Sequence, residues 1–172
     1  ALEQFDRRER ETKAVDSEDR EIRNLLAVRL LLTENRSEDA HVVFTQGRSA
    51  SNQDRHSFAD WNRFLQWGEL AVDLGEPQTA LTIADRALGQ IAADPAPKYL
   101  ELREERANAV AGMAHLALND AKAALPQLSR AVTLAETHLD PQRSPHLADT
   151  LIALAEALRR TGQYKAARGV LA

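Results

Sequence analysis

Apolar residues recur along most of the chain at intervals of three and four, the spacing that places them on one face of an α-helix. Polar stretches rich in Ser, Asp and Pro separate these segments. The pattern predicts helices near residues 20–34, 37–49, 58–74, 77–93, 97–118, 121–138, 146–161 and 164–172. Pro126 falls inside the sixth of them, where it removes a backbone hydrogen bond and is expected to bend the helix mildly. The sequence therefore predicts an all-α fold.

Four residues that favour a left-handed backbone stand at similar intervals along this pattern. They are Asn35, Gly75, Asn119 and Gly162, which lie 40, 44 and 43 residues apart. Glycine and asparagine are the residues that most often end a helix in the left-handed conformation. We therefore expect a tight turn between two helices at each of them, and a repeat of helical hairpins.

Small residues recur in step with these turns. Seven residues before the turn residue stand Val28, Gly68, Gly112 and Ala155. Five residues after it stand Ala40, Ala80, Ala124 and Ala167, and twelve after it stand Gly47, Ala87 and Ala131. Such rows let two helix axes approach closely, and one hairpin cannot bury its apolar face alone. We expect a charged lead-in at 1–20 and then a solenoid of stacked repeats at 21–60, 61–104, 105–147 and, truncated, 148–172.

The last unit, "LADTLIALAEALRRTGQYKAARGVLA", resembles the tetratricopeptide repeat in its alanines and its Gly-x-Tyr turn. The long period and the lead-in "ETHLDPQRSPHLADTLIALA" look more like the kinesin-light-chain type of this repeat. The resemblance implies a right-handed superhelix whose concave groove binds a protein or peptide. Similar arrays are common beside bacterial protein kinases and in large bacterial regulators, so it also implies a role in signalling.

Composition narrows the possible partners. The 172 residues carry a net charge of -4 with a pI near 5.8, and this charge gives no basic surface for nucleic acid. No apolar run is long enough to cross a membrane. The absence of cysteine suits the cytosol, our expectation, but is also compatible with export to the periplasm.

Enzyme motifs are absent from the sequence. There is no glycine-rich phosphate loop, no His-Glu-x-x-His and no Gly-x-Ser-x-Gly. Glu69 and Asp73 share a helix face as paired carboxylates do, but two acids on a helix usually form a solvated surface. Trp61, Phe64 and Trp67 lie three apart and are expected to hold neighbouring units together. We expect no catalysis, no cofactor and no metal.

Because the sequence contains no enzyme motif, we predict its function from the expected shape of its surface. In the expected superhelix, the first helix of each unit lines the concave side. The side chains expected in that groove are mixed aliphatic and charged, as at protein interfaces: Arg29, Leu32, Asn62, Leu65, Glu69, Arg106, Met113, Leu116, Ile152, Glu156 and Arg159. The sequence predicts a scaffold that binds a protein or peptide. The alternative is a ligand-sensing domain of a bacterial regulator, in which a small molecule occupies the groove.

The pattern begins and stops in the middle of a unit, so we expect a fragment of a larger protein. Natural arrays end in a helix with a polar outer face. Leu154, Leu158, Val170 and Leu171 are therefore expected to lie uncovered. An apolar surface of this kind predicts self-association through the C-terminal end.

Overall fold

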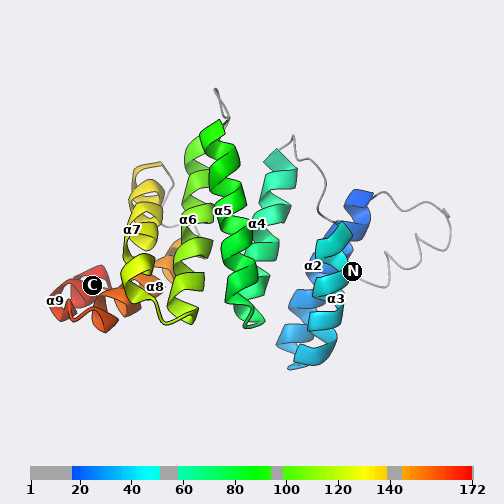
Figure 1. Cartoon of the computed structure of the whole chain (residues 1–172), viewed down its shortest axis with the longest axis horizontal. Coiled ribbons are helices and arrows are strands. Elements are labelled where there is room, and N and C mark those ends of the chain that lie inside the picture. Colours follow the sequence, from blue (N-terminus) through cyan, green and yellow to red (C-terminus); the bar gives the residue numbers. More distant parts are fainter. Residues whose placement is uncertain (1–16, 51–57, 94–98, 139–144, 172) are drawn as a thin grey trace.

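The protein is described by a computed structural model, which covers residues 17–50, 58–93, 99–138 and 145–171 (Figure 1). This part of the chain holds eight α-helices and no strand, which confirms the all-α prediction. The helices are α2 (Ser17–Thr33), α3 (Ser37–Ala50), α4 (Phe58–Asp73), α5 (Pro77–Ala93), α6 (Leu100–Ala117), α7 (Ala121–His138), α8 (Pro145–Arg160) and α9 (Tyr164–Val170).

The same turn joins the two helices of each successive pair. Asn35, Gly75, Asn119 and Gly162 all have positive φ, between 59° and 81°. In the first turn the amide of Asn35 donates to the carbonyl of Leu32, and the amide of Arg36 donates to that of Leu31. Equivalent bonds form in the other three turns, so each is a Schellman motif that satisfies the last carbonyls of its helix. The predicted left-handed helix ends are confirmed at all four positions.

The pairs follow one another along the long axis of the molecule (Figure 1). Helices α2, α4, α6 and α8, the first of each pair, contact one another in succession. Helices α3, α5 and α7 pack against the first helix of their own pair and also touch the first helix of the next. Side chains that are 40 or more residues apart in the sequence are therefore neighbours along the row of first helices.

The small residues of the second helices lie where these helices meet the first ones. Ala40, Ala80 and Ala124 are fully buried, whereas Ala167 is half-buried. A β-carbon placed on Gly112 would lie 2.4 Å from Cγ of Leu128, because α6 and α7 approach so closely. These positions pack as predicted for the first three pairs.

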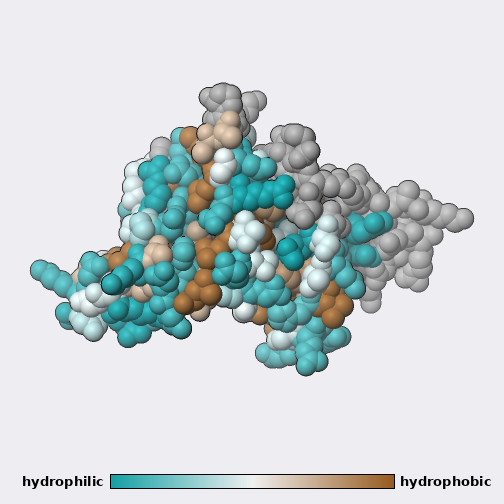
Figure 2. Space-filling view, viewed as in Figure 1, coloured by the Kyte–Doolittle hydropathy of each residue, from teal (hydrophilic) through white to brown (hydrophobic). Residues whose placement is uncertain are grey.

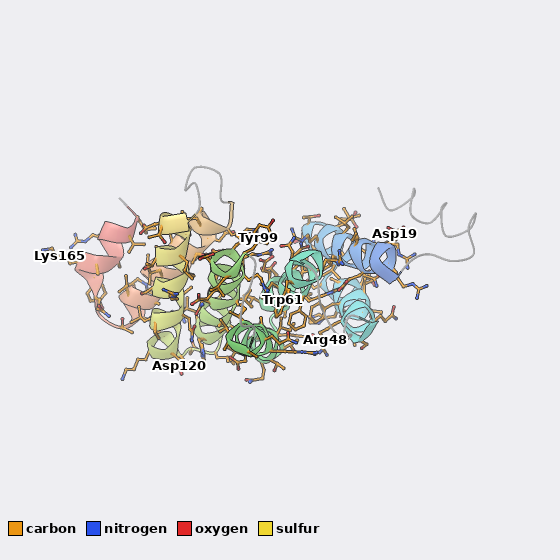
Figure 3. All side chains as sticks on the ribbon, turned by 90° about the horizontal axis from the view of Figure 1, so that it is seen from above. Asp19, Arg48, Trp61, Tyr99, Asp120 and Lys165 are labelled. Carbon is orange, nitrogen blue, oxygen red and sulfur yellow. The ribbon has the colours of Figure 1, made fainter. Side chains whose placement is uncertain are left out.

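The aromatic stripe of α4 is buried, as predicted. Trp67 meets Phe44 of α3 edge-on, with ring centroids 5.6 Å apart. Its indole nitrogen donates to Oε1 of Glu21 on α2 at 3.0 Å. Figure 3 shows Trp61 near the middle of the molecule, with Asp19 and Lys165 toward opposite ends. Trp67 thus joins α4 to the pair that precedes it, whereas Trp61 lies under the guanidinium of Arg103 on α6.

Some predicted boundaries differ from the structure or lie outside its described part. Helix α2 begins three residues earlier than expected, at Ser17, and the rest of the lead-in, 1–16, is not described. Helix α7 continues through Pro126, whose ring is exposed, so the expected bend stays a prediction. Leu154 and Leu158 are buried in the core between α7 and α8, and the expectation that they lie uncovered is wrong.

Candidate functional site

The four first helices together enclose a hollow of about 390 Å³, here called the central pocket. Helix α2 contributes one residue and the other three helices three each. The lining is Arg29; Glu69, Val72 and Asp73; Arg106, Ala109 and Met113; and His146, Asp149 and Thr150. These residues come together because α2, α4, α6 and α8 contact one another in succession.

Glu69 lies at the centre of a polar network in this pocket. Nε of Arg106 donates to Oε1 of Glu69 at 3.2 Å, and its Nη2 donates to the same oxygen. Nη1 of Arg106 donates to Oδ1 of Asn62, and Nη2 of Arg29 donates to Oε2 of Glu69 at 3.5 Å. The Arg106 side chain is largely buried, whereas that of Arg29 is half-exposed. Arg106 therefore ties α6 to α4, and Arg29 remains accessible to a ligand.

Acidic groups surround this network. Burial raises the pKa of the Asp73 carboxyl, Glu69 and Asp149 raise it further, and Arg29 lowers it. Nδ1 of His146 lies 3.9 Å from Oε1 of Glu69. The pocket wall thus combines three carboxylates and two guanidinium groups with the apolar side chains of Val72 and Met113. A wall of both charges and apolar groups suits a ligand that carries the same mixture.

A second hollow of about 270 Å³ lies between α2 and α4 and shares Arg29 with the central pocket. Its wall is more apolar, with Ile22, Leu25 and Leu26 from α2. Asn62, Arg63 and Gln66 complete its lining from α4. Leu26 is exposed here. The two hollows therefore form one inner surface, with an apolar site on one side of Arg29 and a charged site on the other.

The structure brings together only part of the predicted groove. Arg29, Glu69, Arg106 and Met113 line the central pocket, and Asn62 lines the second hollow. Leu32 is half-buried against the core of the first two pairs.

Two of the predicted groove residues are not available to a ligand. Leu65 is 1% exposed and Leu116 is 8% exposed, because both pack into the hydrophobic core, and neither lines the central pocket or the second hollow. The expectation that they point into the groove is therefore wrong.

Three further predicted residues lie at another site. Ile152, Glu156 and Arg159 line a hollow between α8 and α9, outside the central pocket. Nε of Arg159 donates to Oε2 of Glu156 at 2.7 Å, and Nε of Arg160 donates to Oε1 at 2.6 Å. These hydrogen bonds lower the pKa of Glu156 to about 2.

The sequence prediction missed the contribution of α8 to the central pocket. His146, Asp149 and Thr150 face it from the first turns of that helix. Their spacing of three and four residues is the signal that places them on one helical face. This spacing is visible in the sequence, but it does not show which face of α8 meets α6.

Glu105 is a buried carboxyl on α6, next in the sequence to the pocket residue Arg106. It is almost fully buried on α6, and Oε1 makes no hydrogen bond. Burial raises its pKa to about 7, an effect that Arg106 opposes and Glu69 strengthens. The folded protein therefore holds this proton over a pH range in which the unfolded chain, with the ordinary value of 4.5, has released it.

The stability of the folded protein is therefore expected to fall as pH rises from about 5 to about 8, because the folded state binds more protons than the unfolded state in this range. Glu105→Gln is expected to stabilise the protein by roughly 2–3 kcal/mol at pH 8 and to have little effect at pH 4.5. Urea unfolding at several pH values measures this difference. Glu136→Gln, at an exposed position on α7, is the matched control. An equal effect of Glu105→Gln at both pH values would contradict the assignment.

Comparisons with known proteins gave no relatives: no family model, no curated protein and no solved structure matches the chain. None of the helices that the structure describes is both long and apolar enough to cross a membrane. Among the described residues, no group of three or more His, Asp or Glu side chains is placed to hold a metal ion.

Proposed function

We propose that the chain is a non-catalytic binding module, a tetratricopeptide-like array that holds a protein or peptide segment on its inner surface. In this proposal the four helix pairs form a right-handed superhelical solenoid, and α2, α4, α6 and α8 line its concave side. The identical turns at Asn35, Gly75, Asn119 and Gly162 support a repeat of this kind. The pI near 5.8 supports a partner other than nucleic acid. The proposed location is the cytoplasm, with the periplasm as the alternative.

The observation that carries the proposal is the pair of hollows joined at Arg29. A peptide lying along the inner surface would place an apolar side chain beside Ile22 and Leu26 and a polar one in the central pocket. Arg29 is half-exposed and Met113 is half-buried, so both offer surface to a ligand. Arginine and methionine are enriched at protein interfaces.

The test is selection of peptides from a random display library on the immobilised protein. Met113→Glu and Arg29→Glu are each expected to weaken binding of the selected peptides at least about tenfold, because they change the apolar wall and the accessible cation. Val42→Glu is the control, since Val42 is an exposed apolar residue of α3, which does not line either hollow. Selected peptides whose affinity falls with Val42→Glu but not with the two inner variants would contradict the proposal.

A second candidate is a ligand-sensing domain of a signalling protein, and the size of the central pocket favours it. A volume of about 390 Å³ falls within the range of small-molecule sites. Arg29, His146 and Asp149 would then fix a polar metabolite. The two candidates differ in the ligand, because a metabolite that fills the pocket raises the melting temperature without any peptide.

A further inference from the structure

Two of the three carboxylates that line the central pocket have no bonded partner. Asp73 belongs to α4 and Asp149 to α8, and within the residues that the structure describes neither side chain makes a hydrogen bond or an ion pair. Glu69, the third carboxylate, accepts hydrogen bonds from Arg106 and Arg29. The bases of the pocket are therefore used on Glu69, and the other two carboxylates are left without one.

These two carboxylates repel each other across the pocket. Burial raises the pKa of the Asp73 carboxyl most, and the charges of Glu69 and Asp149 raise it further. Arg29 opposes this effect without cancelling it, since the pKa of Asp73 stays above its ordinary value. A cation placed between two like charges lowers the energy of both. The pocket without a ligand thus has an excess of negative charge, which a cationic group can neutralise.

The wall beside these carboxylates is apolar and suits a long basic side chain. Val72 of α4 and Ala109 and Met113 of α6 line the same pocket. Lysine and arginine pack their methylene stems against apolar surface while their charged ends reach polar groups. A metal ion fits less well, because no three His, Asp or Glu side chains in the described part of the chain are placed to hold one. The wall therefore matches an organic cation that has an apolar stem.

The second hollow favours a peptide over a free amine. It adjoins the central pocket at Arg29 and has Ile22 and Leu26 in its wall, so it offers a separate apolar site. A peptide can fill both hollows with two of its side chains, whereas a small amine fills one. Arg29 lies between them, where its guanidinium can donate to carbonyl groups of the peptide backbone. The net charge of -4 also attracts a basic partner.

We infer that the central pocket binds a lysine or arginine side chain of the peptide, with the cationic end between Asp73 and Asp149 and the stem against Val72 and Met113. This inference rests on the proposed function, because it names the side chain by which the bound peptide enters the pocket. The partner is then a basic segment that also carries an apolar side chain for the second hollow.

The test uses the peptides that the parent protein selects from the random library. They are expected to share a lysine or arginine close to an apolar residue. Asp73→Asn and Asp149→Asn remove one charge each and keep the shape of the side chain. Each is expected to weaken binding about tenfold in calorimetric titration. A peptide with glutamine in place of the basic residue is expected to bind the parent and both variants equally weakly, because the charge pair is then missing in every case.

Asp85→Asn is the matched control. Asp85 is an exposed aspartate of α5 that lines neither hollow, and Figure 2 shows hydrophilic residues over much of the face formed by α3, α5 and α7. The control is expected to change the affinity by less than about twofold, because it makes the same change of net charge away from the site. The free diamine cadaverine is expected not to displace the peptide when both are present at equal concentration.

The outcomes separate this inference from the proposed function. Selected peptides without a basic residue, or equal affinity for the parent and for the variant that carries both Asn substitutions, would overturn the inference. If such peptides still shift the amide signals of α2, α4, α6 and α8, the proposed function stands without it. Displacement by an equal concentration of cadaverine would also overturn the inference, because the occupant would then be a free amine. A library that yields no binding peptide would overturn both.

Discussion

Ala124→Trp is expected to destabilise the protein by about 3 kcal/mol or more, a large share of the stability of a domain of this size. Ala124 is fully buried on α7, one turn before Leu128, which packs against Gly112 of α6. The helices approach so closely there that Gly112 leaves no space for a β-carbon beside Leu128. An indole ring at Ala124 must therefore push the two helices apart. Ala80→Trp is expected to act in the same way, because Ala80 is fully buried on α5 one turn before Ile83, which packs against Gly68 of α4.

Ala148→Trp is the matched control, because Ala148 is an exposed alanine of α8. It is expected to change stability by no more than about 0.5 kcal/mol. Urea unfolding of the three variants and the parent measures these differences. If Ala124→Trp and Ala80→Trp unfold at the same urea concentration as Ala148→Trp, the helices do not meet along the alanine rows.

The second large effect is expected from Trp67→Ala, at about 3–5 kcal/mol. The ring of Trp67 fills the space between Phe44 and Gly47 of α3, and it is fully buried. Truncation leaves a cavity there and removes the hydrogen bond from the indole to Glu21. Because these contacts join α4 to the first pair, the loss of stability is expected to be largest in α2 and α3.

Hydrogen exchange monitors where stability is lost. Amides of α2 and α3 are expected to lose protection in Trp67→Ala, while those of α6 and α7 keep theirs. Trp67→Phe retains a ring without the hydrogen-bond donor and is expected to cost less than half as much. A uniform loss of protection over all helices would show that the first pair does not depend on Trp67 in particular.

Local features of the sequence predicted the helices and their turns well. A left-handed backbone at Asn35 or Gly75 depends on that residue and on the helix that ends there, so its position could be predicted without knowing the fold. The small rows at Ala80 and Ala124 follow from helical spacing, and the aromatic stripe of α4 follows from it too. These features are set by residues close together in the chain.

The candidate site was harder to predict, because it depends on which helix faces are covered. Leu65 and Met113 both look like groove residues in the pattern, yet Leu65 is buried and Met113 lines the central pocket. Each first helix has neighbouring helices on several sides, and the spacing of residues alone does not show which face each neighbour covers. The bond from Arg106 to Glu69 joins residues 37 apart, so no local signal reveals it. The place of His146 beside Glu69 was missed for the same reason.

Chemical-shift mapping shows directly whether the inner surface binds a protein or peptide. A peptide selected on the protein is titrated into the isotope-labelled chain, and the backbone amide signals are followed. We expect the largest shifts in α2, α4, α6 and α8, around Arg29, Glu69 and Met113, and we expect Met113→Glu to remove them. Shifts confined to α3, α5 and α7, or to the hollow between α8 and α9, would contradict binding at the inner surface.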